Sequence, residues 1–532
     1  MTAVGKSAAG PLQLPNFRRL WTAGLAVNLA LWMQAVGASW LMLSLAPTPL
    51  MVALIQTAQS LPAFLFALPA GVLADLVNRK ALTLCAYAGF VVSAVIACAA
   101  TAHGAMTAGL LLVVTAAIGA AFAIQAPAVH TSLAESVPRE QLFAALALSA
   151  VSFNVARAVG PALAGAVVSM GGAVAVFALC TLLFGFAFTA ALRWRHQAQA
   201  RDLPPEHILV GVRGALQYAK HSPVMQSQLM RTLMFVGAAS GLWALLPIVA
   251  SSRLSLGADG YGLLLGCLGA GAVAGAVIAV RLSRRWSLNS VGIASALLYT
   301  ASVAVVCVSR DMPLVCIALT CAGAGWAIVG NVNLTAIQTA IPPWVRARAM
   351  ALYLLVFQGS MAAGGVLWGG VATHSSLEVA LLASVLALAA TAVLMRVLPA
   401  RIGEEAEATP TQMTEMPSLS EAPHEQDGPV AVQVNYVIRA TDREEFLTVM
   451  QALGRSRKRD GARFWRIYRD LRQPHRYVER FVIRSWTEYL RQRSRMTEAD
   501  RRVERRAQSL HLGPEEPDMQ LMLAERTSGS AN

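Results

Sequence analysis

Long apolar runs constrain the fold of this chain more than any other feature. A membrane-spanning helix needs roughly 20 mostly apolar residues, and the first 400 residues supply twelve such runs in two sets of six. The predicted spans are 20–45, 50–76, 81–102, 105–129, 142–170 and 173–192, then 233–250, 261–280, 288–308, 312–334, 349–372 and 377–398. All seven cysteines fall in these runs without CxxC spacing, so we expect neither a disulfide framework nor a metal site. No cleavable signal peptide is evident.

The distribution of charge indicates how these helices are oriented. Residues 1–400 hold 21 Lys and Arg against 8 Asp and Glu, whereas residues 401–532 hold 22 against 21. The basic excess therefore belongs to the apolar part, which argues against a nucleic-acid partner. The basic residues recur in alternate loops, at Arg79 and Lys80, Arg139, Arg193, Arg195, Arg201, Arg213, Lys220, Arg281, Arg284, Arg285, Arg346 and Arg348. Because Lys and Arg in short loops resist translocation, both termini and these loops are predicted to be cytoplasmic, in an inner membrane.

The two sets of six helices repeat each other at an offset of 205 residues. Arg79-Lys80 falls on Arg284-Arg285, Pro138 on Pro343, Gly160 on Gly365 and Gly165 on Gly370. We therefore predict an N-terminal half over 1–192, a cytoplasmic link over 193–232 and a C-terminal half over 233–400.

Two motifs resemble those of the major facilitator superfamily. The stretch Gly71-Val-Leu-Ala-Asp75-Leu-Val-Asn-Arg79-Lys80 resembles the signature loop between helices 2 and 3 of that superfamily. The stretch Arg157-Ala-Val-Gly160-Pro161-Ala-Leu-Ala-Gly165 resembles the "antiporter" motif of its drug exporters. Small residues let helices approach closely, and a proline leaves a carbonyl unpaired.

The opening Asn16-Phe-Arg-Arg-Leu-Trp more narrowly resembles the transmembrane secretion effector branch, which includes an enterobactin exporter. The resemblance implies secondary active efflux of siderophore- or drug-like molecules, driven by inward proton movement. Two alternatives stay open: an importer, and a membrane-anchored monooxygenase-like enzyme or ligand sensor whose activity lies in the tail. No Walker-type sequence occurs, so neither ATP-driven transport nor a cofactor is expected.

Ionisable residues are scarce in the membrane part, which limits the candidates for proton coupling. Arg157 is the one fixed charge expected within a span of the first half, either as a functional group or as a snorkelling residue. Asp75, Glu135 and His130 are the candidates linked to protons, although each also fits a role in anchoring a loop.

Neutral polar groups are expected to line the central cavity, because buried amides in lipid-spanning helices face the bundle interior. These candidates are Gln34, Trp40, Gln56, Gln59, Gln125, Asn154, Asn331, Asn333, Gln338 and Gln358. Some of them are expected to join helices rather than bind substrate. A cavity of this kind suits neutral or anionic amphiphiles.

The composition changes abruptly after Leu398. Residues 401–429 are predicted to form a flexible acidic linker, 430–526 a folded cytoplasmic domain and 527–532 a disordered end. The predicted order is a strand from 430, a helix over 442–459, strands near 462–470 and 475–484, a long helix over 486–510 and a strand over 519–525. The whole chain is thus predicted to be an all-α bundle of 12 transmembrane helices plus a small α+β, ferredoxin-like (βαββαβ) domain.

The tail resembles the domains of antibiotic-biosynthesis monooxygenases, which pair into α/β barrels. The matching stretch runs from Tyr477 through Trp486 and Tyr489 to Gln492. The resemblance implies a His in many relatives where Tyr489 stands, so a role in homodimerisation or ligand sensing is favoured over catalysis. The chain is therefore predicted not to be an enzyme, and its expected partners are membrane lipid, a small-molecule substrate and a second copy of itself.

Overall fold

A computed structural model describes residues 10–194, 216–400, 409, 411, 423–424, 427–513 and 517–525, without the side chains of 67, 68, 71–76, 343 and 347. The contacts divide the chain into two compact units. The membrane unit comprises Met1–Pro205, Leu229–Leu334 and Ala351–Ala400. The tail unit comprises Glu206–Gln228, Thr335–Met350 and Arg401–Asn532, so it includes the ends of helices that the sequence assigns to the bundle.

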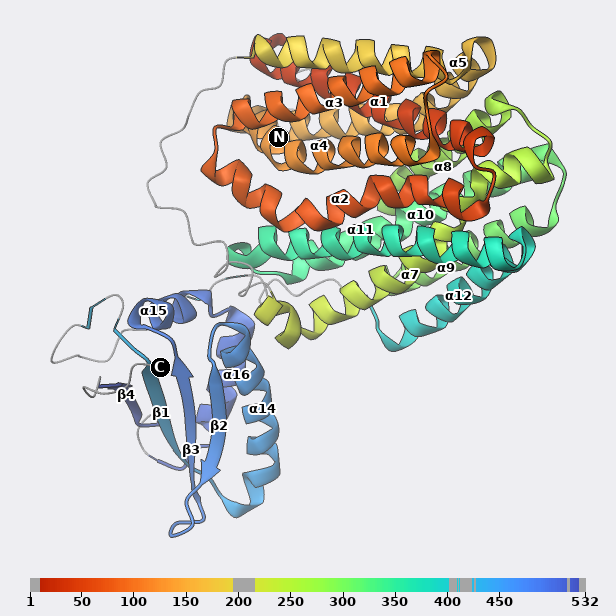
Figure 1. Cartoon of the computed structure of the whole chain (residues 1–532). Helices are drawn as coiled ribbons and strands as arrows, with labels where there is room; N and C mark the ends of the chain where they lie inside the picture. Colours follow the sequence, from red (N-terminus) through yellow and green to blue (C-terminus); the bar gives the residue numbers. More distant parts are fainter. Residues whose placement is uncertain are drawn as a thin grey trace, which may run out of the picture. The chain divides into compact units, whose positions relative to one another are not determined.

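The helices with membrane-spanning character follow the predicted order (Figure 1). Their bounds are α1 (Pro15–Leu45), α2 (Pro49–Leu76), α3 (Arg79–Ala102), α4 (Ala108–Glu135), α5 (Leu142–Leu192), α7 (Pro223–Ile248), α8 (Ala258–Leu282), α9 (Leu288–Val308), α10 (Met312–Ala340), α11 (Pro343–His374) and α12 (Leu377–Val397). In the described residues, 11 helices are long and apolar enough to cross a membrane. Short turns at Gly10–Gln13 and Arg139–Gln141 precede α1 and α5, and a π-helical turn, Val249–Arg253, extends α7.

The sixth predicted span, 173–192, lies in the second part of α5, which accounts for 11 helices in the described residues where twelve spans are predicted. Backbone torsion angles leave the helical range at Gly171 and Gly172, and Gly172 has a φ of 69°, which a side chain would disfavour. The chain turns there, where the sequence predicts the fifth and sixth spans to meet. Helix α7 differs more, because it begins at Pro223 rather than near residue 233.

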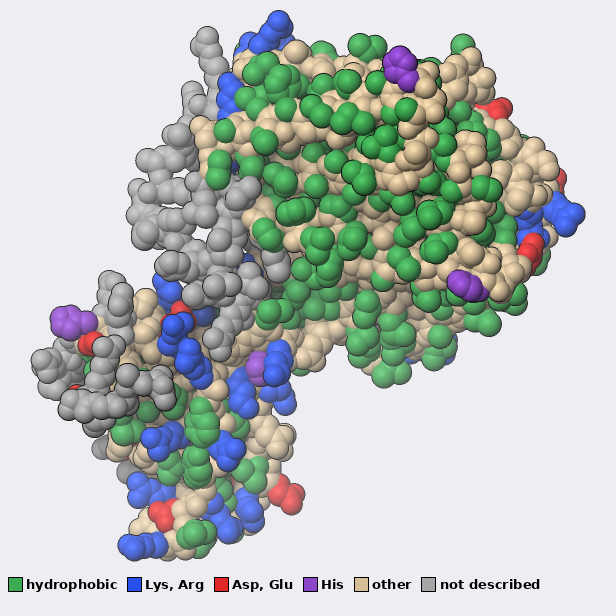
Figure 2. Space-filling view, in the orientation of Figure 1, with side chains coloured by type: hydrophobic (Ala, Val, Ile, Leu, Met, Phe, Trp, Pro, Cys, Tyr) green, Lys and Arg blue, Asp and Glu red, His purple; other side chains and the backbone are tan. Residues whose placement is uncertain are grey.

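The surface of the membrane unit is apolar, as expected for helices that face lipid (Figure 2). Phe143 and Met170 are 85% and 88% exposed, and other large apolar side chains on the same helices are exposed too. Small and aromatic residues fill the interior, where Tyr87, Phe90, Phe184 and Tyr299 are fully or almost fully buried. Association in lipid depends on close packing, because lipid tails are as apolar as the side chains.

The tail unit contains a four-stranded antiparallel sheet in the order β2-β3-β1-β4. The strands are β1 (Val430–Val437), β2 (Phe464–Arg469), β3 (Arg476–Ile483) and β4 (Met519–Leu523). Val432 of β1 lies opposite Phe481 of β3 and Leu521 of β4, which aligns the apolar residues on one face. Helix α14 (Arg443–Arg459) follows a short turn, Ala440–Asp442, and packs Phe446 and Met450 into this core.

The predicted long helix over 486–510 is wrong, because two helices occupy this stretch. They are α15 (Trp486–Arg495) and α16 (Glu498–Ser509). Met496 is extended, and Thr497 forms a capping box with Asp500 at the start of α16. Such a box satisfies helix-terminal N–H groups reciprocally, so it starts a new helix where composition alone predicts continuation.

Candidate functional site

The two halves of the bundle meet where helices α5 and α8 approach each other without intervening side chains. A Cβ added to Gly165 would lie 2.6 Å from the carbonyl oxygen of Ala258 and 2.9 Å from the Cα of Gly262. A Cβ added to Gly262 would lie 2.5 Å from the carbonyl oxygen of Pro161. A Cβ added to Gly269 would lie 2.5 Å from the carbonyl oxygen of Arg157. The antiporter-like motif therefore forms a backbone-to-backbone contact with the opposite half.

Helices α2 and α11 make the second close contact between the halves. The Thr57 hydroxyl and the Gln56 side-chain amide donate to the carbonyl oxygens of Ala362 and Met361, at 2.9 and 3.0 Å. The Leu50 amide donates to the Thr373 hydroxyl at 2.9 Å, close to the loops that lack Lys and Arg. The halves are thus in contact toward the end of the bundle opposite the basic loops.

The glycine contacts reveal how the two halves correspond in space. Gly160 packs against Trp32 of α1, and Gly364 packs against Ser240 of α7. Gly165 packs against α8, and Gly369 packs against Ala53 and Leu50 of α2. Since α1 and α2 occupy the places in the first half that α7 and α8 occupy in the second, Gly160 and Gly165 correspond to Gly364 and Gly369.

A chain of aromatic rings joins both halves in the interior. Trp32 of α1 lies 6.2 Å from Trp243 of α7, which lies 5.7 Å from Trp326 of α10. Trp326 lies 5.9 Å from Phe357 of α11. These four side chains are only partly buried, and the Nε1 of Trp243 has no hydrogen-bond partner in the described residues. They therefore offer apolar, π-rich surface together with an indole donor.

Two of the predicted cavity amides have side-chain oxygens that are buried without a partner among the described residues. Gln34 of α1 donates to the Thr115 hydroxyl of α4 at 3.2 Å, whereas its side-chain oxygen has no partner in the described part of the chain. The side-chain oxygen of Gln125 of α4 is also buried without a described partner. Buried polar groups are normally hydrogen-bonded, so a ligand, a water molecule or a rearrangement would supply a donor to each of these two oxygens.

The other predicted cavity residues are distributed more widely. Trp40 stacks on Tyr261 at 6.1 Å and so joins α1 to α8. Asn333 is buried and donates to the Thr232 hydroxyl at 3.4 Å, which joins α10 to α7. Gln338 is exposed and belongs to the tail unit. The remaining candidates are partly buried: Gln59, Asn154, Asn331 and Gln358.

Arg157 is a half-buried cation within α5. Its Nη2 donates to the Asn154 side-chain oxygen at 3.1 Å, and its guanidinium lies 5.8 Å from the ring centroid of Phe153. Its Nε is buried without a partner among the described residues. No carboxylate contacts this guanidinium in the described part of the chain, so its charge is balanced only by dipoles there.

Among the residues of the signature loop, Arg79 and Lys80 are described in full. The Arg79 Nη1 lies 2.6 Å from the Glu135 carboxylate, which ties α3 to the end of α4. The Lys80 ammonium donates to the carbonyl oxygen of Leu192 at the end of α5 at 3.0 Å. The side chains of Gly71 and Asp75 lie outside the described residues, and His130 is exposed on α4.

Arg231 is a buried cation that the sequence reading assigned to a loop. Its Nη1 donates to the Asn289 side-chain oxygen at 2.8 Å and to the carbonyl oxygen of Leu398 at 2.9 Å. Its Nε donates to the Asn333 side-chain oxygen at 3.4 Å. The guanidinium thus connects α7, α9, α10 and the end of α12, and it satisfies a carbonyl that a helix end leaves open.

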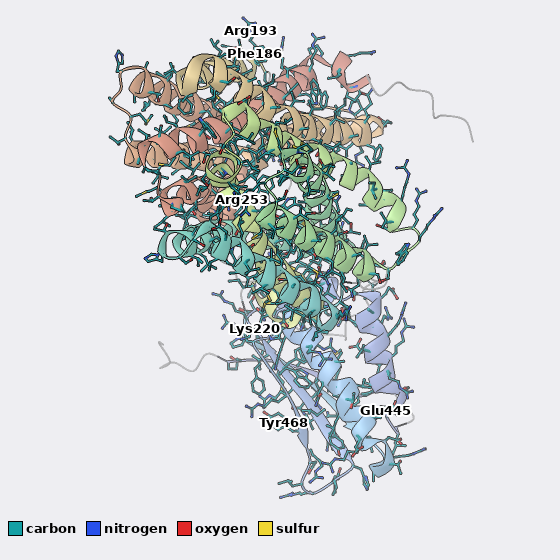
Figure 3. The ribbon with its side chains drawn as sticks, turned by 90° about the vertical axis from the view of Figure 1, so that its right-hand side faces the viewer. Phe186, Arg193, Lys220, Arg253, Glu445 and Tyr468 are labelled. Carbon is teal, nitrogen blue, oxygen red and sulfur yellow. The ribbon has the colours of Figure 1, made fainter. Side chains whose placement is uncertain are left out.

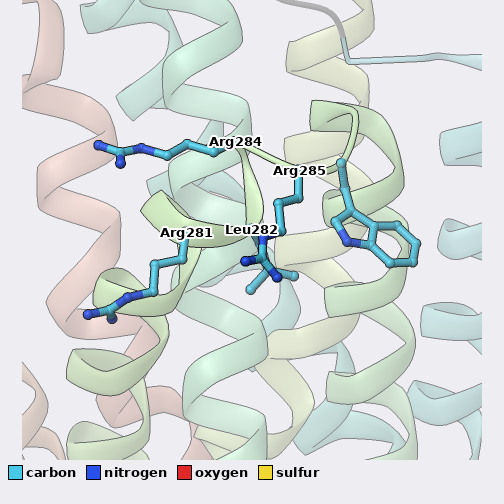
Figure 4. A pocket seen from close by; sticks show the side chains of 5 residues that line it. Arg281, Leu282, Arg284 and Arg285 are labelled. Carbon is cyan, nitrogen blue, oxygen red and sulfur yellow. The ribbon is translucent and has the colours of Figure 1, made fainter.

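The basic loops mark one end of the bundle. Arg281, Arg284 and Arg285 project from the turn between α8 and α9 and, with Leu282 and Trp286, line a surface hollow of about 420 Å³ (Figure 4). At the other end of these helices, Arg253 (labelled in Figure 3) donates to the carbonyl oxygen of Ser309 and lies 3.6 Å from Glu378. Arg253, one of the few basic residues at this end, is therefore close to an acidic side chain.

Sequence reasoning missed Trp32, Trp243, Trp326 and Arg231. The signals were present in part, because the chain has 11 tryptophans and Arg231 comes two residues before a predicted span. Which of these residues converge depends on how the helices pack, and a local pattern does not contain that information.

Comparison with known proteins agrees with this architecture. A family model described as transmembrane secretion effector matches residues 6–528, which include both the bundle and the tail. No curated protein matches the chain. One similar solved structure is a variant of the nucleoside transporter NupG, with a TM-score of 0.62 and 12% sequence identity, covering 72% of this chain and 100% of that chain. Another is a D-xylose-proton symporter, with a TM-score of 0.56 and 13% identity, covering 73% of this chain and 98% of that chain.

A bacterial homolog of the human lysosomal transporter Spinster, in an inward-facing and occupied conformation, is also similar. Its TM-score is 0.60 and its sequence identity 13%, and the match covers 74% of this chain and 97% of that chain. At such identities the likeness concerns the fold alone. The family match over nearly the whole chain, the apolar helices and the transporter fold agree. The chain therefore belongs to the transmembrane secretion effector family and is a multi-pass membrane transporter of the major facilitator type.

Proposed function

We propose that this transporter is a secondary active exporter of small amphiphilic molecules, siderophore- or drug-like, that works by alternating access. In this proposal it lies in the inner membrane with both termini and the basic loops in the cytoplasm. The observation that carries the proposal is the group of four aromatic side chains supplied by both halves. Rocking of one half against the other would move these rings apart or closer together, and this couples substrate binding to the change of access.

The proposed substrate class follows from the chemistry of the candidate residues of both halves. Trp32, Trp243 and Trp326 suit apolar or aromatic groups, while the open acceptors of Gln34 and Gln125 suit hydroxyl or amide donors. Arg157 adds a single positive charge without a described counter-ion. Neutral or anionic amphiphiles fit this set better than cations do.

The halves meet toward the end opposite the basic loops, which corresponds to closure at the outer face if those loops are cytoplasmic. The contacts of Gly165 with α8 and of Leu50 with Thr373 support this assignment. Export then requires these contacts to open after the substrate binds from the cytoplasm. The backbone contacts between α5 and α8 suit this because they involve no side-chain hydrogen bonds, whereas α2 and α11 must break those of Gln56, Thr57 and Thr373.

Proton coupling is proposed through Asp75, Glu135 and His130. The pair between Arg79 and Glu135 gives a physical route, because protonation of Glu135 removes one charge of the pair that ties α3 to α4. Arg157 and the Gly160-Pro161 segment are proposed to transmit the change to α8, where their backbone is in contact.

The tail is proposed to be a ferredoxin-like domain that mediates homodimerisation or ligand sensing rather than catalysis. The strand order β2-β3-β1-β4, with helical segments between β1 and β2 and between β3 and β4, supports this. Tyr489, where the resemblance leads us to expect His, is buried, stacks on Trp486 at 5.2 Å and accepts a hydrogen bond from Arg493. The face of the sheet opposite α14 carries Val437 and Tyr468, both at least 40% exposed, and is the proposed pairing face (Figure 3).

The direct test is substrate accumulation in cells that express the wild type, Asp75→Asn or Arg157→Ala, with and without a protonophore. Arg285→Gln serves as the control, because it removes one charge from an exposed loop. We expect the wild type to lower accumulation in a protonophore-sensitive way and both test variants to lose this effect at equal membrane abundance. Higher accumulation in the presence of the protein would instead make it an importer, and equal accumulation for all substrates tried would contradict transport of this class.

A further inference from the structure

A strongly basic pocket lies within the tail unit. It has a volume of about 610 Å³. Seven of its lining residues are Lys or Arg and one is Glu: Lys220, Arg348, Lys458, Arg459, Arg463, Arg484 and Arg495, with Glu488. These residues come from three segments that are far apart in sequence: the stretch after residue 215, the first turns of α11, and the folded tail domain.

The segments are held together by specific contacts. The Gln217 side-chain amide donates to the carbonyl oxygens of Lys458 and Ala462, at 2.8 and 3.3 Å. Tyr218 meets Trp344 edge to face, with ring centroids 5.9 Å apart. Gly461 closes the turn after α14 with a φ of 132°, a conformation that favours glycine. The pocket is therefore a built feature of this unit.

Some of the positive charge is already balanced. Arg459 pairs with Asp460 and Asp500, at 2.8 and 2.5 Å. Arg495 lies 3.8 Å from Glu488 and donates to the carbonyl oxygen of Asp460. These two arginines act mainly as the frame of the pocket.

Other cations of the pocket remain open to solvent. The side chains of Lys220, Arg463 and Arg484 are exposed, and no ion pair involving them occurs among the described residues. They come from the segment after residue 215, the turn after α14 and the end of β3. Like charges placed together are unfavourable unless an anion joins them, so a ligand with several negative charges would stabilise the arrangement.

Trp344 adds a second, independent sign of a binding site. The Arg495 guanidinium lies 4.4 Å from the centroid of its ring, which fixes the indole in the pocket wall. Its Nε1 is buried and has no hydrogen-bond partner among the described residues. An acceptor oxygen of a bound anion would satisfy this buried donor.

We infer that this pocket binds a phosphate-bearing anion, either a soluble phosphorylated molecule or the headgroup of an anionic lipid. Arginine and lysine side chains bind phosphate through charge-assisted hydrogen bonds, and several arginines can do so bidentately. The volume lies within the roughly 300–1,000 Å³ that ligand pockets occupy. Helix α11 begins in this pocket, where Trp344 and Arg348 belong to its first two turns, so the bound anion would fix the position of those turns. The inference does not depend on the direction or substrate of transport.

The test uses the full-length protein in phosphatidylcholine nanodiscs, titrated calorimetrically with pyrophosphate at low and at high salt. The test variant is the triple change Lys220→Gln, Arg463→Gln and Arg484→Gln. The control is Arg466→Gln, Arg469→Gln and Arg472→Gln, which removes the same charge from exposed positions of the tail outside the pocket. A second arm measures retention of phosphatidylglycerol by native mass spectrometry for the same proteins, because a headgroup presents the same chemistry.

We expect the test variant to weaken binding by about tenfold or more and the control to bind like the wild type, with affinity falling as salt rises. Binding of pyrophosphate in phosphatidylcholine identifies a soluble ligand, and phosphatidylglycerol retention that the test variant alone loses identifies a lipid. Absence of both, or equal binding by the wild type and a folded test variant, overturns the inference. The single variant Lys220→Gln, outside the folded domain, repeats the test if the triple variant unfolds.

Discussion

The membrane unit and the tail unit are stabilised in different ways. In the membrane unit, helices are joined by glycine contacts and by polar side chains that bond to backbone carbonyls, such as Thr57 to Ala362. In the tail unit, buried arginines join helices to the sheet and to each other. Arg457 lies 2.6 Å from Glu504 of α16 and 3.5 Å from Glu479 of β3, and Glu479 has no exposed surface.

The difference follows from the surroundings of each unit. Within lipid, apolar side chains gain nothing by leaving the solvent, so association relies on close packing and on backbone groups. The tail has few apolar residues for its charge, and it fills part of its interior with paired ions, whose pairing must offset the loss of hydration. Burial raises the pKa of Glu479, while the nearby Arg457 lowers it. This contrast predicts that the stability of the tail unit is most sensitive to loss of a buried charge, whereas that of the membrane unit is most sensitive to added side-chain volume at a close glycine contact.

The largest effect is expected for Arg457→Leu in the tail. This change leaves Glu479 buried without its cation, and removing one partner of a buried pair costs about 3–5 kcal/mol. Hydrogen exchange of tail peptides in the full-length protein should show loss of protection in α14, β3 and α16, with the membrane helices unchanged. Arg455→Leu on the exposed side of α14 is the matched control and should leave protection intact. Equal behaviour of the two variants would contradict the stabilising role of the buried pair.

A smaller effect is expected for Gly165→Ala in the bundle. The new Cβ would lie 2.6 Å from the Ala258 carbonyl oxygen, so α5 and α8 must separate, at a cost of about 1–3 kcal/mol. Thermal unfolding in detergent and transport should both decline. Gly185 lies on the same helix with no atom within 4 Å of an added Cβ. Gly185→Ala should be neutral or mildly stabilising, since alanine favours helix. A similar loss in both variants would show that helix backbone freedom, rather than close contact, is what matters.

A third prediction concerns pH and the buried Asp460. Burial, opposed by Arg459, raises the pKa of Asp460 to about 6, above the roughly 3.9 of an unfolded aspartate. The folded state then holds more protons between about pH 4 and 6, so this group lowers stability as pH rises through that window. The stability of Asp460→Asn relative to the wild type should therefore increase from pH 4 to 6, as measured by hydrogen exchange at matched pH.

Asp470 supplies a control of opposite sign for this pH effect. Its carboxylate accepts backbone hydrogen bonds from Arg472 and Gln473, which lower its pKa. Because its folded pKa lies below the roughly 3.9 of an unfolded aspartate, it adds stability as pH rises up to about 5. Asp470→Asn should therefore lose stability relative to the wild type as pH rises toward that value and stay level from there to pH 6. A variant at position 460 that follows the same trend as Asp470→Asn would rule out the raised pKa.

The smallest effect is expected at the exposed pair of Arg506 and Glu445. Both side chains are about half exposed, and surface pairs contribute about 0–1 kcal/mol. Arg506→Gln should change tail protection little, and any change should vanish at high salt. A loss of tail protection as large as that caused by Arg457→Leu would contradict the difference in stabilisation between buried and exposed ion pairs of the tail.

The sequence predicted much of the fold because its signals are local. Apolar runs of spanning length predicted where the membrane helices lie, and basic residues in alternate loops distinguished one end of the bundle from the other. The strands of the tail followed from apolar alternation at Val430, Val432 and Val434. The candidate site was predictable only as residue types. The glycines of α5 were identified, but the residues they contact were not.

What the sequence alone determined is which segments leave water, since that depends on the hydration of each side chain and its neighbours along the chain. Only the tertiary structure decided which segments meet. It brought Trp32, Trp243 and Trp326 together and placed Gly165 against α8. It also buried Arg231 among four helices and assembled the basic pocket around Trp344. The physical reason is that close packing and the pairing of charges act between residues far apart in sequence, whereas hydrophobic length is a property of each segment by itself.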